Sequence, residues 1–190
     1  MTHVTSRIAA LAVVPLLLLT ASCGGDTSAD PSNADSAKSP GSSGDAAAAS
    51  IPDEICSAFT AADFEAIVGA PGTMEEQPGG GCEYSQEDPR AVTVTINALA
   101  VAAESDYDAA RGGATGPMDD PKITDGDTPG DHSFIGIGTM FGGSNLQGSG
   151  GATNGKLIVL TNVVQAQGLP SEEITRLSTA LLELAAAKLF

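Results

Sequence analysis

The chain has 190 residues, and its 8 Lys and Arg against 24 Asp and Glu give a formal net charge of −16. A surface this acidic repels phosphate backbones and anionic headgroups, which excludes nucleic acid as a partner. It favours basic or cationic partners, although the same charge also keeps a protein soluble.

The first 22 residues have the pattern of an export signal. Arg7 precedes an apolar run over residues 8–19, which Pro15 interrupts. The run is shorter than the roughly 20 apolar residues that a membrane-spanning helix needs. We therefore predict that residues 1–22 are a cleaved signal peptide.

The segment that ends this signal, Thr20-Ala21-Ser22-Cys23, resembles the bacterial lipobox, with Thr20 at the position where Leu is favoured. In lipobox signals the Cys thiol takes a diacylglycerol group by thioether linkage, so the resemblance implies a lipidated Cys23 as the new N-terminus. One acyl chain binds a membrane only marginally, whereas two or three hold a protein there. We expect an anchor on the extracytoplasmic side of the cell membrane. The alternative is ordinary secretory cleavage near Ala21 or Ser22, which releases a free protein.

Residues 24–50 are almost entirely Gly, Ser, Asp, Ala, Pro and Thr, without an apolar period. This composition is typical of a disordered tether. With the lipidated Cys23, the tether is predicted to span residues 23–50. Residues 51–190 are then predicted to form one extracellular domain with one core.

The chain has three cysteines, an odd number that needs an explanation in an exported protein. Lipidation accounts for Cys23. Cys56 and Cys82 remain, and an oxidising compartment favours a disulfide between them. A metal site that also uses His132 is the rival interpretation, but it would need an unidentified fourth ligand.

The domain begins with a predicted short helix. Thr60 and Asp63 have the spacing of a capping box, and Phe59 and Phe64 have that of a hydrophobic staple. Gly69 is expected to end the helix.

A hairpin and a second helix are predicted next. Residues 82–85 and 92–96 are separated by a turn, and the second segment alternates as a half-buried strand does. Residues 102–111 predict a helix that Gly112 and Gly113 end.

The last third of the chain predicts a loop, three strands and a helix. Residues 118–131 are acidic and rich in Gly and Pro, which predicts a loop. Strands are expected over residues 133–141, 144–147 and 157–164, with an Asn154-Gly155 turn before the last. The terminal helix opens at Pro170 and carries an apolar stripe of core residues: Ile174, Leu177, Leu181, Leu184 and Ala185. The fold class is α+β, with an antiparallel sheet packed by helices.

The order of these motifs resembles a known family. Cys56 before a short helix, Cys82-Glu83-Tyr84 after a Gly-rich turn, Tyr107 in the second helix and the segment 129–134 resemble the actinobacterial lipoproteins called domain of unknown function 3558. That domain is similar to extracellular sensor domains of some mycobacterial serine/threonine kinases. The resemblance implies a disulfide between Cys56 and Cys82 and a sheet packed by helices. It implies no established activity and no catalytic residues.

A search for catalytic groups gives no site. A Ser/His/Asp arrangement would have to use His132, and on a strand its neighbours Asp131 and Ser133 would point to the opposite face. We therefore expect no enzyme activity and no cofactor.

A calcium site is the weak metal candidate, formed by Asp125, Asp127 and Asp131 on a Gly-rich loop. Pro129 occupies a ligand position of the EF-hand pattern, and Gly136 stands where the bidentate Glu belongs. A solvated acidic loop is the favoured interpretation.

The sequence as a whole predicts a membrane-anchored lipoprotein of the cell envelope. Its domain is expected to be a noncatalytic binding or sensor-type module for an unknown protein or small-molecule ligand. One alternative is a carrier that holds a hydrophobic ligand in a cavity between sheet and helices. Another is an envelope hydrolase that uses carboxylates.

Overall fold

The computed structural model describes Ile51, residues 54–127 and residues 129–190. The predicted signal peptide, Cys23 and the tether lie outside the described residues, so the predictions about them stay predictions. In the part of the chain that is described, no helix is both long and apolar enough to cross a membrane.

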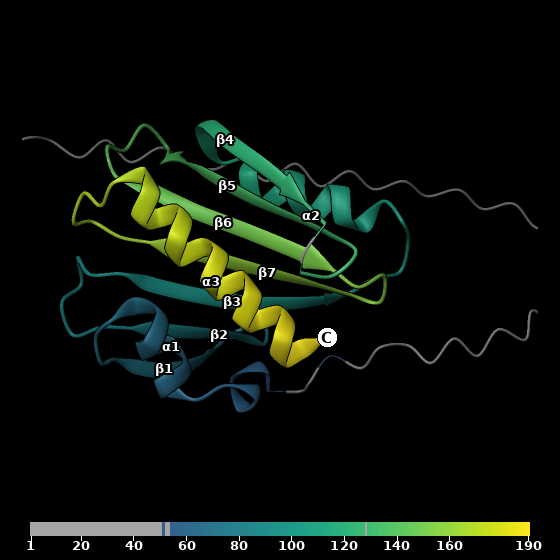
Figure 1. Cartoon of the computed structure of the whole chain (residues 1–190), viewed down its shortest axis with the longest axis horizontal. Helices are drawn as coiled ribbons and strands as arrows, with labels where there is room; N and C mark the ends of the chain where they lie inside the picture. Colours follow the sequence, from purple (N-terminus) through teal and green to yellow (C-terminus); the bar gives the residue numbers. More distant parts are fainter. Residues whose placement is uncertain (1–50, 52–53, 128) are drawn as a thin grey trace, which may run out of the picture. The chain divides into compact units, whose positions relative to one another are not determined.

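Seven antiparallel strands form one sheet in the order β1-β2-β3-β7-β6-β5-β4 (Figure 1). The strands are β1 (Thr73–Gln77), β2 (Gly81–Ser85), β3 (Thr93–Ala100), β4 (Met118–Gly126), β5 (His132–Met140), β6 (Leu146–Thr153) and β7 (Leu157–Val164). The chain runs through β1, β2 and β3, crosses by helix α2 (Asp106–Thr115) to the far edge, and returns strand by strand until β7 pairs with β3. The predicted antiparallel α+β fold is confirmed.

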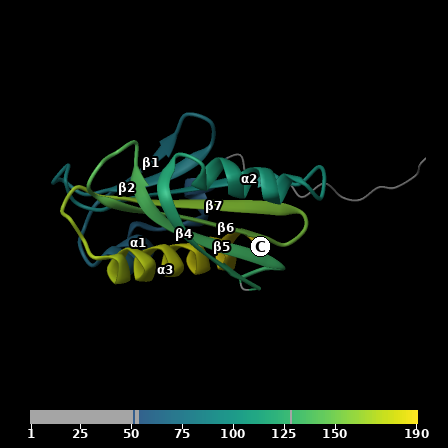
Figure 2. The same ribbon diagram turned by 90° about the horizontal axis from the view of Figure 1, so that it is seen from above.

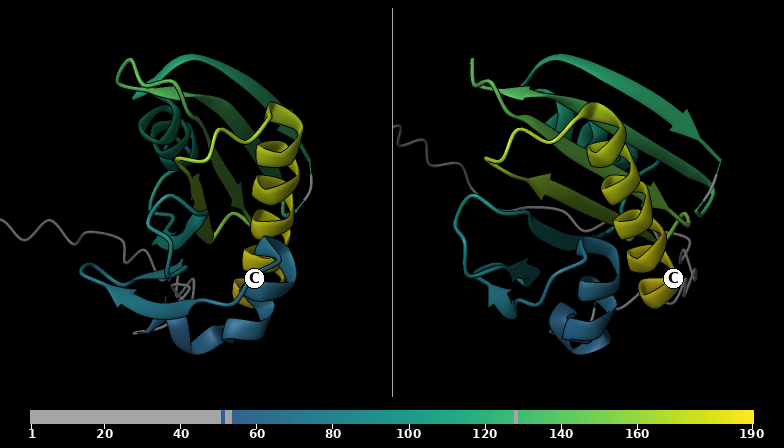
Figure 3. Two further views of the ribbon diagram at one scale, coloured as in Figure 1. Left: turned by 90° about the vertical axis from the view of Figure 1, so that its left-hand side faces the viewer. Right: turned by 60° about the vertical axis from the view of Figure 1, so that its left-hand side comes forward.

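The helices cover both faces of this sheet. Figures 2 and 3 show α1 (Ala61–Val68) and α3 (Ser171–Leu189) on one face and α2 on the other. The predicted stripe of α3 packs on β6 and β7, where Ile174, Leu177, Leu181 and Ala185 are buried and Leu184 is partly buried. The space between α3 and the centre of the sheet is therefore filled by side chains.

Helix α1 begins and ends as predicted. The Thr60 hydroxyl accepts the Asp63 N–H at 3.3 Å, and the Asp63 carboxylate accepts the Thr60 N–H at 2.8 Å. These two bonds form the capping box. The rings of Phe59 and Phe64 lie 5.5 Å apart, and Gly69 ends the helix at φ 83°.

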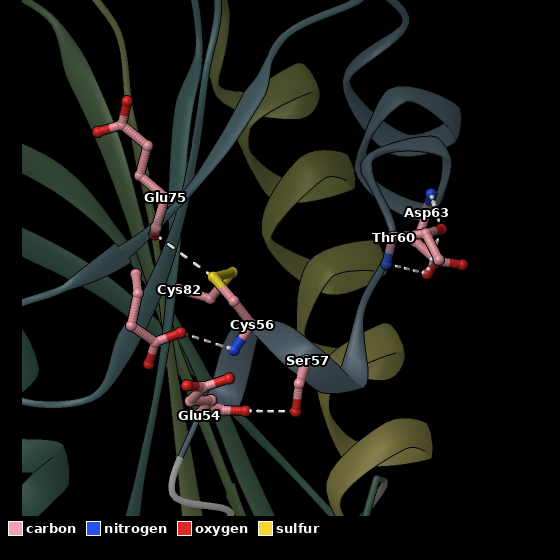
Figure 4. The surroundings of a disulfide bond; sticks show 8 residues. Glu54, Cys56, Ser57, Thr60, Asp63, Glu75 and Cys82 are labelled. Carbon is pink, nitrogen blue, oxygen red and sulfur yellow. Dashed lines mark hydrogen bonds between the residues drawn. A yellow bond between two sulfur atoms is a disulfide. The ribbon is translucent and has the colours of Figure 1, made fainter.

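A disulfide joins Cys56, in the short helix η1 (Ile55–Ala58), to Cys82 in β2 (Figure 4). The Cys56 N–H also donates to a Glu76 carboxylate oxygen at 3.2 Å, which holds η1 against β1. The predicted disulfide is confirmed. The alternative metal site fails because both sulfur atoms are used in the bond.

The predicted acidic loop is wrong over residues 118–126, which form strand β4. The pattern misled because Pro121 and the acids are typical of loops. They are also typical of an edge strand, and β4 is the last strand of the sheet. The register shifts between Asp119 and Lys122, and this bulge keeps Pro121 out of the hydrogen-bond ladder.

The predicted end of the second helix is also wrong. Helix α2 starts at Asp106 and continues through Gly112 and Gly113 to Thr115. Each glycine costs about 1 kcal/mol relative to Ala inside a helix. Packing on the sheet, where Thr115 is buried, outweighs that preference.

Strand β6 is longer than the predicted residues 144–147 because its glycines belong to the strand and not to a turn. A Cβ atom at Gly148 would collide with the Ser178 hydroxyl of α3, and one at Gly151 would collide with the Phe134 ring. Glycine therefore lets α3 and a neighbouring aromatic ring approach β6 closely. Strand β1 was not predicted.

Candidate functional site

Two cavities lie beside α2 and share Tyr107, Asp108 and His132. Their volumes are about 480 Å³ and about 370 Å³. The larger is bounded by the chain before α2, the start of β5 and the β6–β7 turn, and the smaller by α2 and the end of β4. We call the two together the α2 groove. Helix α2, which borders both cavities, lies on the sheet face opposite α3 (Figure 2).

The chain before α2 forms one wall of the groove and is held by backbone hydrogen bonds. The Asp106 carboxylate accepts the N–H groups of Ala102 and Ala103 at 2.7 and 2.8 Å. These bonds favour the charged form and hold the pKa of Asp106 below its ordinary 3.8. The Val101 N–H donates to the Lys156 carbonyl at 2.9 Å, which ties this wall to the β6–β7 turn.

The opposite wall is the start of β5. The Asp131 N–H donates to the Thr153 carbonyl at 2.7 Å, and His132 pairs with Thr153 in the ladder. Gly130 precedes them at φ 83°, and a Cβ atom there would collide with the same carbonyl. Only glycine fits this close approach, which fixes where Asp131 and His132 stand.

Tyr107 and His132 form an aromatic pair that lies between the two cavities. The Tyr107 ring centroid is 5.8 Å from that of His132 and 6.2 Å from that of Phe134. Burial raises the pKa of the Tyr107 hydroxyl, and the charges of Asp125 and Asp108 add to this while the charge of Arg111 opposes it. Tyr107 therefore stays a neutral ring at physiological pH.

Carboxylates outnumber basic groups around this pair. Five acidic side chains line the groove: Glu104, Asp108, Asp125, Asp127 and Asp131. Arg111 also lines it, and its guanidinium is paired with Asp125 at 2.9 Å. A groove that is negative and has an aromatic wall attracts cations through charge and through the ring faces.

The structure does not bring the three calcium candidates together. Asp125 and Asp127 line the smaller cavity, whereas Asp131 lines the larger one. Asp125 already pairs with Arg111. Among residues 54–127 and 129–190, no group of three or more His, Cys, Asp or Glu side chains could hold a metal ion.

The Ser/His/Asp arrangement was rejected for a reason that holds only in part. Ser133 is buried whereas His132 is exposed, as alternation along a strand requires, although both residues line the smaller cavity. Asp131 lines the same cavity as His132, against expectation, because it precedes the first residue of β5.

The sequence analysis did not single out Glu104, Tyr107, Asp108 and Arg111 as site residues. Tyr107 and Asp108 lie four and three residues before Arg111, and this spacing is the signal that could have grouped each of them with Arg111 on α2, whereas Glu104 precedes the helix. The partners that this face meets come from β4 and β5, which are distant in sequence.

A scan against protein-family models and searches of curated proteins and solved structures found no match to this chain. The resemblance to domain of unknown function 3558 therefore stays a prediction.

Proposed function

We propose that this chain is a membrane-anchored lipoprotein of the cell envelope whose domain binds a cationic ligand, without catalysis, in the α2 groove. The observation that carries the proposal is the groove itself, which is lined by five carboxylates, the Tyr107–His132 pair and one guanidinium that is already paired. Ligands that fit this chemistry are amines and guanidinium groups, free or on a basic peptide. Nucleic acid does not fit, because the chain is strongly acidic.

The location rests on different features. The export signal and Cys23 support an anchor on the extracytoplasmic side, and the disulfide between Cys56 and Cys82 is typical of proteins that fold in an oxidising compartment. Mass spectrometry of the mature N-terminus tests the anchor. Diacylglycerol on Cys23 would support it, and an unmodified N-terminus would contradict it.

Both walls of the α2 groove are held by hydrogen bonds. Asp106 accepts the N–H groups of Ala102 and Ala103 in one wall, and the Thr153 carbonyl accepts the N–H of Asp131 in the other. A groove with fixed walls loses little conformational entropy when a ligand binds, which favours affinity. This preorganisation suits a binding module. The groove carboxylates of Glu104, Asp108 and Asp131 are on exposed residues, unlike the buried carboxyl pair that a hydrolase would favour.

Calorimetric titration of the mature chain with tetralysine tests the ligand class. We expect binding that weakens as salt is added, because screening reduces the attraction between exposed charges. Tyr107→Leu should weaken it by about 2- to 30-fold, the range of a cation–π contact, while Tyr107→Phe keeps the ring and the affinity.

A matched charge control separates the groove from the acidic surface in general. Asp108→Asn in the groove and Glu172→Gln in the first turn of α3 each remove one carboxylate. Only Asp108→Asn should weaken binding markedly. Equal losses of affinity in the two variants would mean that tetralysine binds through the net charge of the chain and not through the groove, and the proposed site would be wrong.

A further inference from the structure

The carboxylates of the α2 groove are divided between its two cavities. Glu104 and Asp131 line only the larger cavity, whereas Asp125 and Asp127 line only the smaller one. Asp108 lines both. A single amine can therefore meet the carboxylates of one cavity, and a ligand that meets them all has to place cationic groups in both.

Most of these carboxylates have no basic partner in the chain. In the part of the chain that the structure describes, Asp125 is the one groove carboxylate that forms an ion pair, with Arg111 at 2.9 Å. The carboxylates without an ion pair all belong to exposed residues, which a ligand can reach: Glu104, Asp108, Asp127 and Asp131. Three of them line the larger cavity and two line the smaller one, because Asp108 belongs to both.

The carboxylates are too dispersed to share one multivalent ion. Over the described ranges 54–127 and 129–190, no three acidic, His or Cys side chains form a group that could hold a metal. A divalent cation needs its oxygen ligands at about 2.0 to 2.6 Å. Carboxylates that lie apart are matched by cationic groups that also lie apart on the ligand.

The residues that the two cavities share are mostly aromatic. Besides Asp108 they are Tyr107, which is half-buried, and His132, which is exposed, with ring centroids 5.8 Å apart. An alkyl chain that crosses from one cavity to the other would exchange water for contact with these rings. Each methylene that it buries would strengthen binding by up to about 4-fold. A polar linker would lose hydrogen bonds to water at the same place.

The two cavities differ in their charge. No basic side chain lines the larger cavity apart from His132, which lines both, whereas Arg111 lines only the smaller one. Asp125 offsets the charge of that guanidinium, which leaves Asp108 and Asp127 to attract a cation there. A ligand with one ammonium should therefore prefer the larger cavity.

We propose, on the basis of the cation site proposed above, that its ligand is a linear alkyl diamine. One ammonium lies in the larger cavity, the other lies in the smaller cavity, and the alkyl spacer crosses the Tyr107–His132 pair. Primary amines of this kind are charged at physiological pH. Once one ammonium is bound, the other is held at a high effective concentration beside its own cavity, so the two contacts reinforce each other.

Calorimetric titration of the mature chain with linear diamines, from ethylenediamine to octanediamine, tests the spacing. Each diamine is compared with the monoamine of the same carbon number. The salt concentration is about 0.15 M, where a screening length of about 8 Å limits attraction to nearby groups. We expect the ratio of the two association constants to pass through a maximum at an intermediate length. The maximum should be about 5-fold above the ratio for ethylenediamine, the effect of one additional exposed ion pair.

Three variants assign each ammonium to its cavity. Asp127→Asn, in the smaller cavity, should weaken the best diamine by about 5-fold and its monoamine by less, which removes the maximum. Asp131→Asn, in the larger cavity, should weaken the monoamine and the diamine alike. Glu172→Gln, in the first turn of α3, removes one carboxylate outside the groove and should leave the maximum in place.

Failure of the diamine ligand is distinguishable from failure of the cation site. A ratio that falls steadily as the chain lengthens is the result expected from net charge alone. That result, or a maximum that Asp127→Asn leaves intact, would overturn the diamine ligand while amine binding in the groove stands. Amines that do not bind at all, tetralysine included, would contradict both the diamine ligand and the cation site.

Discussion

Removal of the disulfide should destabilise the domain by an amount that follows from loop length. Cys56 and Cys82 are 26 residues apart. In the chain-entropy model, opening a loop of that length costs about 3.5 kcal/mol, which corresponds to a drop of roughly 10 °C in melting temperature for a domain of this size. The perturbation is Cys56→Ala with Cys82→Ala. Alanine is chosen because Cys82 is fully buried and a Ser hydroxyl there would need a partner.

Equilibrium unfolding in guanidinium chloride measures the loss, and reduction of the wild-type disulfide provides a control with both cysteines in place. Both comparisons should lose about 3.5 kcal/mol. The m-value should rise in both, because an unfolded chain without the crosslink exposes more surface. A loss below about 1 kcal/mol in both would show that the crosslink constrains the unfolded chain far less than its loop length implies, and would refute the reasoning.

Four other variants test particular contacts. Gly148→Ala should destabilise the domain by about 1 to 3 kcal/mol because its Cβ collides with Ser178. Gly112→Ala, which has open space around its Cβ, should stabilise the domain by about 0.4 to 1 kcal/mol. Equal effects of the two variants in thermal unfolding would contradict this. Hydrogen bonds from its helix N-cap and the charge of a nearby lysine hold the pKa of Asp63 below 3.8. The wild type should therefore have a higher free energy of unfolding than Asp63→Asn above about pH 4, and this difference should vanish as the pH falls through the lowered pKa. A difference that persists unchanged in acid would contradict the assignment. Phe141 lies at φ 53°, which glycine adopts freely, so Phe141→Gly should raise the free energy of unfolding by about 1 kcal/mol, and a decrease would show that the ring packs against its own chain.

Local sequence signals predicted the elements whose cause is local. The capping box of Thr60 and Asp63 located α1, and the alternation of residues 92–96 located the core of β3. The apolar period located α3 and most of its buried face. These rules act within a few residues, so sequence alone carries them.

The predicted secondary structure was wrong where contacts between residues distant in sequence decide the structure. The glycines of β6 looked like turn residues, yet Gly148 and Gly151 are needed because α3 and Phe134 approach the strand. Pro121 looked like a loop residue because the sequence does not say that β4 lies at an edge. Neither fact can be read from neighbouring residues.

The candidate site could be predicted only in part for the same reason. Tyr107 and Arg111 share a helix face, which their spacing of four residues reveals. That this face meets His132 follows from the crossover that carries the chain from β3 to β4 and back through β5. A crossover of this kind can be recognised only from the whole fold, and not from local sequence.

The most direct test of the central claim is to map where a cation binds. Amide chemical shifts of the isotope-labelled mature chain, recorded by NMR during titration with tetralysine, report the contacted surface residue by residue. The account predicts saturable changes that cluster on Glu104, Tyr107, Asp108, Asp131 and His132. Changes spread over the acidic surface, or centred on α3, would contradict a cation site in the α2 groove.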